Sequence, residues 1–523
     1  MQAASGFTRE KMIEKLRSNA VWDLIIIGGG ATGLGTALDS ALRGYKTLLL
    51  EQSDFAKGTS SRSTKLVHGG VRYLAQGNIK LVYHALRERG LLLKNAPHLV
   101  KKQNFIIPVY TLWSKLKYLV GLKLYDWLSK SLSFGSSSFL SRQQVLQEFP
   151  NLESKNLLGG IEYFDGQFDD ARLAINLAQT AAEEGAVMLN YFQVSALVKT
   201  SGKVSGVECL DLESGNRYRV EGKSVINATG VFVDDILRLD NDGSKAMVSP
   251  SQGVHIVLNR SLLDSKSALM IPETRDGRVL FAIPWHEHLL IGTTDTPVSE
   301  HQLEPKPLKQ EIDFILETVG QFIDPKPAVG DVLSVFAGLR PLAAITENTK
   351  TTKEISRDHK LVVSESGLIT ITGGKWTTYR QMAEETVNKA ITIGHLDRKV
   401  SGTSQRKIHG YVNSAAAGSL SIYGSDAEKI KALQELDPVG HTTVIKGFPQ
   451  TKAEVVWAIR NEMARTVEDI LARRFRILFL DARAAKEAAP VIAAIMAEEL
   501  GYDESWKANQ VDGFGKLVLQ YLP

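Results

Sequence analysis

Short apolar runs alternate with amphipathic stretches over the first fifty residues. Residues 22–27 form an apolar run that leads directly into glycines, a pattern typical of a buried parallel strand. Residues 31–43 have the periodicity of a helix that stops at Gly44, and a second apolar run at residues 46–50 ends at Glu51. This order of strand, helix and strand predicts the start of an α/β domain with a parallel sheet.

The same kinds of pattern continue along the chain and then change near residue 400. Strands are predicted at residues 101–110, 187–199, 203–212, 217–221, 224–227 and 368–372, with alternating strands between 249 and 295. Helices are predicted at residues 79–95, 169–184, 308–322 and 375–391. Residues 399–421 are rich in Gly and Ser and suggest a linker, whereas residues 427–500 are mostly helical in pattern. We therefore expect a first part at residues 1–400 and a helical C-terminal domain at residues 401–523.

Composition and charge narrow the class of protein. The 523 residues include 62 Lys and Arg against 58 Asp and Glu, so the formal net charge is only +4. This near-balance and the absence of a long basic run argue against nucleic-acid binding. The single Cys excludes an internal disulfide, and no Cys/His set has zinc spacing, so we expect no structural metal.

The N-terminal residues carry no recognisable targeting signal. Residues 1–21 contain six charged side chains between Arg9 and Arg17 and lack the apolar core of a secretory signal. No run of about 18 uncharged apolar residues occurs, so we predict no membrane-spanning helix. The sequence therefore favours a cytoplasmic protein, and it leaves attachment to a membrane surface open.

A glycine motif between the first strand and the first helix predicts dinucleotide binding. Gly28 allows the tight turn, Gly30 lets the backbone approach a pyrophosphate, and Gly33 lets the helix pack closely on the strand. The helix N-terminus then offers N–H groups to phosphate oxygens. Glu51, at the end of the next strand, can hold a ribose hydroxyl. A glycine-rich turn alone is a weak signal, but here strand, glycines, helix, strand and acid coincide.

Three further segments favour FAD over NAD. Two more predicted strands end in glycines, at residues 226–230 and at residues 372–374, and each could meet the same long cofactor. Either one alone would be an ordinary strand-to-helix turn. The loop at residues 58–70 is rich in small hydroxyls and ends in a glycine pair, so it can pass close to a pyrophosphate and a flat ring. A solvated loop is the alternative interpretation of that segment.

Several of these segments together resemble the FAD-dependent glycerol-3-phosphate dehydrogenases. The resemblance lies in SSRSTKLVHGGVRYL at residues 60–74, NATG at 227–230, FAGLRPL at 336–342 and TGGKWTTYR at 372–380. It continues in RTVEDILARR at 465–474 and FLDAR at 479–483, so it covers nearly the whole chain. Related oxidases that pass electrons to oxygen are longer by an insertion, and no obvious insertion is present here.

The resemblance implies a fold, a reaction and a cofactor. The fold would be a Rossmann-like FAD-binding domain of the glutathione-reductase-2 type, with a β-sheet substrate domain and a helical C-terminal domain. The reaction would transfer hydride from C2 of sn-glycerol 3-phosphate to N5 of FAD, giving dihydroxyacetone phosphate, and a membrane quinone would reoxidise the flavin. Cys209 lies far from the motifs, so we expect noncovalent FAD.

The resemblance also implies which residues meet the cofactor and the substrate. The cofactor-binding set is Gly28, Gly30, Gly33, Glu51, Ser60, Ser61, Lys65, His68, Gly69, Gly70, Val194, Ala228, Gly230, Gly373 and Gly374. The substrate site would contain Arg72, Tyr73, Arg340, Lys375 and Thr378, with Arg340 placed just after a strand end. Arginine suits phosphate because its guanidinium forms paired hydrogen bonds. Surface charge is the usual alternative for any single one of these cations.

Histidines supply the candidate general base. His255 alternates with apolar residues on a predicted strand, and from the pattern alone a buried structural histidine is the better interpretation. The resemblance favours a catalytic role for His255. The pair His286 and His288 could mimic a metal pair, but without further ligands nearby we interpret it as a solvated turn.

Residues 112–130 have the sequence of an amphipathic helix. One apolar stripe contains Trp113, Leu116, Val120, Leu124 and Trp127, and the opposite side gathers Lys115, Lys123, Asp126 and Lys130. A core-packed helix gives the same pattern, but two Trp and the surplus of Lys favour a helix that lies in a membrane interface. We therefore expect peripheral contact with the inner face of the cell membrane. The C-terminal helices could equally supply a membrane contact or a homodimer interface.

Two other functions fit the same fold. An amine or 2-hydroxy-acid oxidoreductase would bind a carboxylate, for which Arg340 could also serve, whereas the pair Arg72 and Lys375 favours a phosphate dianion. The second is a membrane-associated FAD protein without enzymatic activity, such as a sensor. Rapid bleaching of the flavin by glycerol 3-phosphate would distinguish both from the dehydrogenase.

Overall fold

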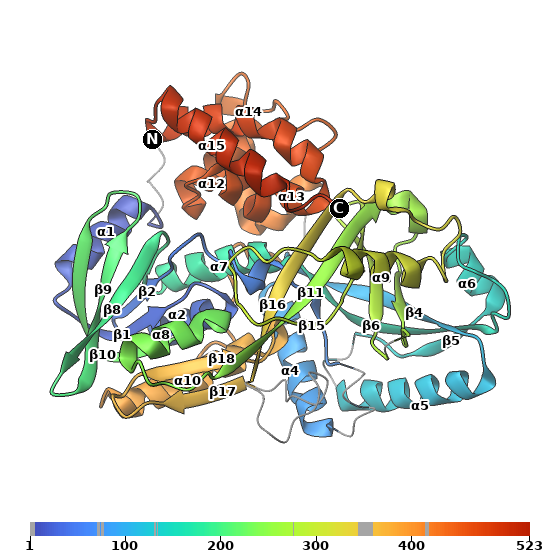
Figure 1. Ribbon diagram of the computed structural model, residues 1–523, viewed down its shortest axis with the longest axis horizontal. Coiled ribbons are helices and arrows are strands. Elements are labelled where there is room, and N and C mark those ends of the chain that lie inside the picture. The colour runs from blue at the N-terminus through green and yellow to red at the C-terminus, as the bar shows by residue number, and fades with distance from the viewer. Residues whose placement is uncertain are drawn as a thin grey trace.

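The computed structural model describes residues 6–70, 74, 78–129, 132, 134–275, 277–343, 359–413 and 418–523. Its described residues form two large sheets and a helical C-terminal part, which lies above both sheets in Figure 1. The predicted α/β fold with a helical C-terminal region is therefore confirmed. The predicted residues Arg72 and Tyr73 lie outside the described residues.

The first sheet is the parallel sheet that the N-terminal pattern predicts. Its order is β17-β18-β10-β1-β2-β7, and its strands are β1 (Val21–Ile27), β2 (Thr47–Leu50), β7 (Val187–Leu189), β10 (Arg217–Asn227), β18 (Ile369–Gly373) and the antiparallel edge β17 (His359–Val363). Helices α2 (Ala31–Leu42), α7 (Asp170–Glu183) and α10 (Tyr379–Ile393) pack against it. Strands β1 and β2 read as continuous apolar runs because parallel strands are buried on both faces.

Two strand predictions differ from the structure around this sheet. The single run predicted at residues 187–199 is split into β7 and β8 (Phe192–Thr200). The two runs predicted at residues 217–221 and 224–227 form one strand, β10. Its first half pairs antiparallel with β9 (Lys203–Asp211), and its second half pairs parallel with β1. Pairing with two different partners explains why the hydrophobic pattern changes in mid-strand.

The second sheet supports the other side of the site. Its order is β15-β11-β14-β13-β12-β4-β6-β3, with β16 beside β11 and β5 beside β6. The strands are β3 (Leu66–Val67), β4 (Val100–Val109), β5 (Ser138–Ser141), β6 (Gly159–Phe168), β11 (Val248–Asn259), β12 (Ala268–Ile271), β13 (Leu280–Trp285), β14 (His288–Gly292), β15 (Thr296–Pro297) and β16 (Ser334–Ala343). Helix α9 (Lys309–Val319) packs against β11. Arg340, expected just after a strand end, instead lies inside β16, directly opposite Ser251 of β11.

Helix α5 (Leu112–Ser129) lies at the lower edge of the molecule in Figure 1, beside α4 (Ile79–Asn95). Its apolar stripe faces outward, since Trp113 is 73% and Trp127 is 70% exposed. Its buried side chains, Leu122, Tyr125 and Leu128, pack on β4, β6 and α4. The apolar residues therefore occupy two faces of this helix, one buried and one open.

The polar side of α5 differs from the expectation. The ammonium group of Lys115 lies 3.5 Å from the ring centre of Phe139, and Lys123 donates to the Ser137 carbonyl at 2.6 Å. Asp126 accepts from the backbone N–H of Ser137 at 2.7 Å. These side chains contact the segment around β5, so they are not a free row of charges for head groups. Lys130 lies outside the described residues.

The C-terminal part has helices α11 (Ala427–Leu436), α12 (Lys452–Glu462), α13 (Ile477–Leu480), α14 (Ala482–Leu500) and α15 (Glu504–Val518). Its apolar core is continuous with Trp285 and Phe336 of the second sheet. Arg474 makes a buried ion pair with Asp54, which follows β2. Residues 399–413, suggested as a linker, lie against the first part: Lys399 O accepts from Arg43 at 2.9 Å, and Thr403 O accepts from Asn95 at 3.3 Å.

His409 joins this segment to both parts of the chain. Its ring nitrogens contact Glu183 at the end of α7 and, at 2.6 Å, Asp426 before α11. Burial alone would lower the pKa of His409, but the hydrogen bonds to Asp426 and Glu183 outweigh it and raise the pKa to about 9.

The raised pKa of His409 predicts a pH-dependent contribution to stability. A histidine whose pKa is raised on folding stabilises the fold fully below the unfolded pKa, near 6.5, and this contribution is lost as the pH rises through 9. A shift of this size corresponds to at most about 3 kcal/mol. Thermal unfolding should therefore separate wild type from His409→Gln at pH 6 and bring their midpoints closer at pH 9.5. A gap that is equally wide at both pH values would contradict the assignment.

Candidate active site

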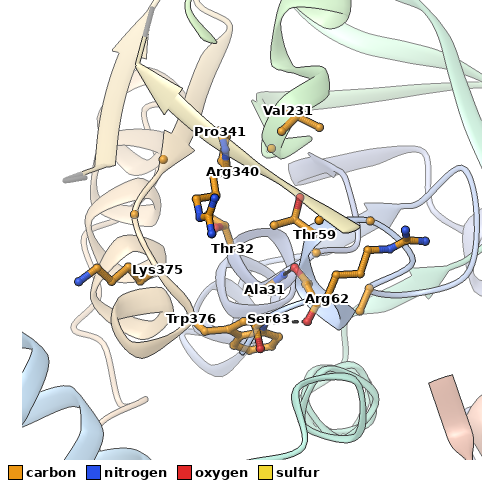
Figure 2. A pocket seen from close by; sticks show the side chains of 18 of the residues that line it. Ala31, Thr32, Thr59, Arg62, Ser63, Val231, Arg340, Pro341, Lys375 and Trp376 are labelled. Atoms are coloured by element: carbon orange, nitrogen blue, oxygen red, sulfur yellow. Dashed lines mark hydrogen bonds between the residues drawn. The ribbon is translucent and has the colours of Figure 1, made fainter. Parts of the chain in front are cut away.

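A large cavity lies where the two sheets meet. Its volume is about 1050 Å³, and its walls come from the carboxyl ends of β1, β2, β10 and β18 and from strands β4, β6, β11, β12, β13 and β16 of the second sheet. In open parallel sheets, the crevice outside the carboxyl ends of the strands is the usual ligand site. Figure 2 shows Arg340 and Lys375 on one side of this cavity and the start of α2 on another.

Most of the predicted site residues that the structure describes line this cavity. They are Gly28, Gly30, Glu51, Ser60, His68, Gly70, Val194, Ala228, Gly230, His255, Arg340, Gly373, Gly374 and Lys375. Five others do not line it: Gly33, Ser61, Lys65, Gly69 and Thr378. Segments more than 300 residues apart in the sequence thus meet around one space.

The glycine turn between β1 and α2 is built for close backbone approach. Gly28 has a φ of +106°, and a Cβ there would lie 2.8 Å from Ala228 O. A Cβ at Gly33 would lie 1.9 Å from Gly28 O, so only glycine lets α2 start this close to β1. A Cβ at Gly30 would meet only the Ser60 hydroxyl, at 3.1 Å. Gly30 therefore leaves open the part of the cavity that a pyrophosphate group would fill.

Glu51 lines the cavity at the end of β2. Its carboxylate accepts from the backbone N–H groups of Gly29 at 2.6 Å and Ser53 at 2.8 Å. Burial raises the pKa of Glu51, and these two hydrogen bonds oppose that rise. A carboxylate has about four acceptor positions, so Glu51 can still accept a hydroxyl of a ribose.

The loop at residues 58–65 is held by residues that lie far apart in the sequence. The Ser60 hydroxyl accepts from Ala31 N at 2.9 Å, and Ser60 O accepts from the Trp376 indole at 2.8 Å. Behind the loop, Lys65 is fully buried and donates to Ser61 O and to Asp170, each at 2.7 Å. Burial lowers the pKa of Lys65 to about 7. Lys65 therefore holds the shape of this loop from behind the cavity wall.

Arg340 of β16 lines the cavity, and its guanidinium contacts β11 and the segment that follows β14. It donates to Gln252 O at 3.3 Å and Thr294 O at 3.0 Å, and its Nη1 lies 3.2 Å from the Asp295 carboxylate. A Cβ at Gly253 would lie 2.4 Å from its Nη2. Gly253 and Asp295 were not among the predicted site residues. The available signal for Asp295 was the Gly-Thr-Thr-Asp run at residues 292–295, which begins at the last residue of β14.

His255 lies on β11 with its ring flat against Phe336, the ring centres being 5.0 Å apart at 16°. Its Nε2 is 3.0 Å from the Thr64 hydroxyl, and a Cβ at Gly292 would lie 2.2 Å from the ring. Burial lowers the pKa of His255 well below 6.5, and the positive charges of Lys65 and Arg340 add to this. The imidazole is therefore neutral near pH 7 and has one nitrogen that can accept a proton.

The remaining predicted residues have other surroundings. Lys375 lies two residues after the end of β18 and lines the cavity. The Thr378 hydroxyl donates to Lys375 O at 3.2 Å. His286 is exposed in a turn, as predicted, and contacts Asp169 at 3.2 Å, while His288 stacks on Phe448. Among the described residues, no group of three or more His, Cys, Asp or Glu is placed to hold a metal ion.

Comparisons with known proteins identify the family. Residues 23–380 match the family described as FAD dependent oxidoreductase, and residues 365–507 match the C-terminal domain of alpha-glycerophosphate oxidase. The mitochondrial glycerol-3-phosphate dehydrogenase of Bos taurus is 40% identical over 98% of this chain and 75% of its own length. The probable mitochondrial glycerol-3-phosphate dehydrogenase of Caenorhabditis elegans is 39% identical over 97% of this chain and 74% of its own length. The chain belongs to the FAD-dependent glycerol-3-phosphate dehydrogenase family.

Solved structures agree with this membership. The glycerol-3-phosphate dehydrogenase of Bacillus halodurans complexed with FAD has a TM-score of 0.80 and 29% identity, and the alignment covers 99% of this chain and 98% of that one. The glycine oxidase of Geobacillus kaustophilus, with a TM-score of 0.54 and 17% identity, shares the fold alone. The predicted flavoenzyme and its FAD cofactor are thereby confirmed.

The residues of this glycerol-3-phosphate dehydrogenase family member fit FAD. The fit rests on the glycine cradle at Gly28, Gly30 and Gly33, which a Cβ would fill, and on Glu51 at the end of β2. Cys209, the only cysteine, is buried in β9 and does not line the cavity. Within the described residues, helices are too short or too polar to cross a membrane.

Proposed function

We propose that this chain oxidises sn-glycerol 3-phosphate to dihydroxyacetone phosphate. The observation that carries the proposal is one cavity that holds a dinucleotide cradle, two cations and a neutral imidazole, namely Arg340, Lys375 and His255. Relatives 40% identical over nearly the whole chain are named for the same reaction. When bound, FAD supplies the hydride acceptor at its N5 atom.

Each of the three residues has a distinct part in this proposal. As C2 of the substrate loses hydride, its hydroxyl must lose a proton, and the neutral ring of His255 accepts it. Four acceptors fix the guanidinium of Arg340 in the cavity, and its positive charge stabilises the oxygen that becomes the carbonyl. Lys375, which also lines the cavity, attracts the phosphate dianion.

Replacing Lys375 by alanine tests the phosphate assignment. We expect KM for glycerol 3-phosphate to rise by roughly tenfold or more, because a charge-assisted contact worth about 1.5–3 kcal/mol is lost. The limiting rate of flavin reduction should change little. Glycerol, which lacks the phosphate, is the control substrate: if Lys375→Ala impairs glycerol oxidation as much, Lys375 does not bind the phosphate.

The competing function is oxidation of an amine or a 2-hydroxy acid on the same fold. Anaerobic mixing with glycerol 3-phosphate, glycine and lactate, followed at the flavin absorption band, separates these functions. We expect fast bleaching only with glycerol 3-phosphate. Fast bleaching by glycine or lactate would contradict the proposal and support an amine or 2-hydroxy-acid oxidoreductase. If none of the three compounds bleaches the flavin, a role without catalysis is favoured.

We further propose that reduced flavin is reoxidised by a quinone in a membrane that α5 contacts. The support is the exposed stripe: Trp113, Leu116, Val120, Leu124 and Trp127 are all at least 40% exposed on one face of the helix. An apolar surface with two Trp, flanked by Lys117, suits the interface of a bilayer. The proposal places this contact at the inner face of the cell membrane, as a peripheral association.

Substituting both tryptophans, Trp113→Ser with Trp127→Ser, tests the membrane contact. Because these side chains are exposed, the variant should fold normally, leave the membrane fraction and keep its activity with a water-soluble dye. Activity with a quinone embedded in vesicles should fall several-fold. Leu122→Ser, on the buried face of the same helix, is the matched control, and it should lower the unfolding temperature. A double tryptophan variant that stays in the membrane fraction would contradict the proposed membrane contact.

A further inference from the structure

The buried face of α5 touches the loop that carries the predicted flavin contacts. Tyr125 is 1% exposed, and its hydroxyl accepts a hydrogen bond from the backbone N–H of Gly69 at 2.8 Å. The same hydroxyl donates to the Asp165 carboxylate at 2.8 Å. One phenol thus joins α5 to the His68-Gly69-Gly70 loop and to β6, although these segments are far apart in the sequence.

The partners of Tyr125 are themselves held in place. Arg89 of α4 donates to the other oxygen of Asp165 at 2.7 Å and lies 5.8 Å from the centre of the Tyr125 ring. Burial raises the pKa of Tyr125 well above 10, and Asp165 adds to this rise, so the phenol keeps its proton. The proton on the phenol goes to Asp165, and its oxygen remains the acceptor for Gly69. The hydrogen bonds therefore run in one direction, from Gly69 N–H to the phenol oxygen and from the phenol O–H to Asp165.

Gly69 fits this contact only as a glycine. A Cβ there would lie 2.6 Å from the Tyr125 hydroxyl and 2.6 Å from the nearest atom of Leu86. Its N–H is used by Tyr125 and is not available to a cofactor. The flanking residues His68 and Gly70 both line the cavity, as does Asp165, whereas Gly69 and Tyr125 do not. The N–H of His68 is held from the other side by the Thr377 hydroxyl at 3.2 Å.

We propose that Tyr125 is a positioning residue for the flavin: its hydroxyl fixes the backbone of residues 68–70 and so couples helix α5 to the retention of FAD. The inference rests on the proposed placement of His68 and Gly70 against the cofactor. It does not depend on the substrate. Without the hydroxyl, Gly69 N–H and the Asp165 carboxylate would each lose a buried hydrogen-bond partner, and the loop would no longer be held in this position.

Tyr125→Phe in the FAD-loaded protein tests the proposal, because it removes one oxygen atom and keeps the ring. Two temperatures are recorded on the same sample: that of flavin release, from flavin fluorescence, and that of unfolding, from circular dichroism. We expect FAD to dissociate about tenfold faster than from wild type, the size expected for one lost buried hydrogen bond. The temperature of flavin release should fall by more than the temperature of unfolding. A merely structural role would lower both temperatures together.

The matched control is Tyr118→Phe, on the same helix, where the side chain is half-buried and packs on the apolar cluster beneath α5. It should leave the FAD dissociation rate unchanged. Equal FAD dissociation rates for wild type and Tyr125→Phe would overturn the proposal. These measurements contain no glycerol 3-phosphate, so a wrong substrate assignment would leave them intact and would show only in the flavin-reduction assay.

Discussion

Arg340→Ala is expected to slow flavin reduction by glycerol 3-phosphate by about 100- to 1000-fold. Removal of one preorganised donor to a developing oxyanion typically has this effect, which corresponds to about 3–4 kcal/mol. Here a second effect adds to it: Asp295, whose side chain is 7% exposed, loses the guanidinium 3.2 Å away and leaves a negative charge beside the substrate. Stopped-flow absorption at saturating substrate measures the change directly.

Two variants separate the charge of Arg340 from its geometry. Arg340→Lys keeps the positive charge but cannot reach Gln252 O and Thr294 O together, so we expect it to restore little of the rate. Gly253→Ala keeps Arg340 but places a Cβ 2.4 Å from its Nη2, and it should displace the guanidinium. Its rate should therefore fall towards that of Arg340→Ala. Full activity in Gly253→Ala would show that the observed position of Arg340 is not the catalytic one.

Gly30→Val should give a folded protein without FAD. In the protein alone, a Cβ at Gly30 meets only the Ser60 hydroxyl, whereas the same atom occupies the space that a pyrophosphate needs. We expect the affinity for FAD to fall by at least ~100-fold, about 3 kcal/mol. The purified variant should be colourless, with the circular dichroism spectrum of a folded α/β protein.

Gly33→Val provides the contrast for this prediction. A Cβ at Gly33 lies 1.9 Å from Gly28 O, which is backbone and cannot move aside, so α2 would have to leave β1. That variant should fail to fold, whereas Gly30→Val should only fail to bind. Yellow Gly30→Val protein with a normal content of FAD would show that the cofactor does not pass this turn.

Local sequence was enough to find the cofactor-binding half of the molecule. The strand, glycine turn, helix and acid between residues 21 and 51 follow from short-range rules, since a parallel strand buried on both faces must be apolar and the tight turn must be glycine. The motifs shared with the glycerol-3-phosphate dehydrogenases then indicated the family and FAD, which the comparisons confirm. Which residues bind and catalyse stays a prediction for the experiments above.

Tertiary structure decided the contacts between distant segments, because side-chain periodicity shows that a face is buried but not what buries it. Arg340 lies within β16 because β11 extends alongside it. Lys65 lies behind the cavity wall because it pairs there with Asp170. The periodicity of α5 gave its amphipathic character, but only the packing on β4, β6 and α4 shows which apolar face stays open. The same packing brings Tyr125 to Gly69, a contact across 56 residues that no local pattern encodes.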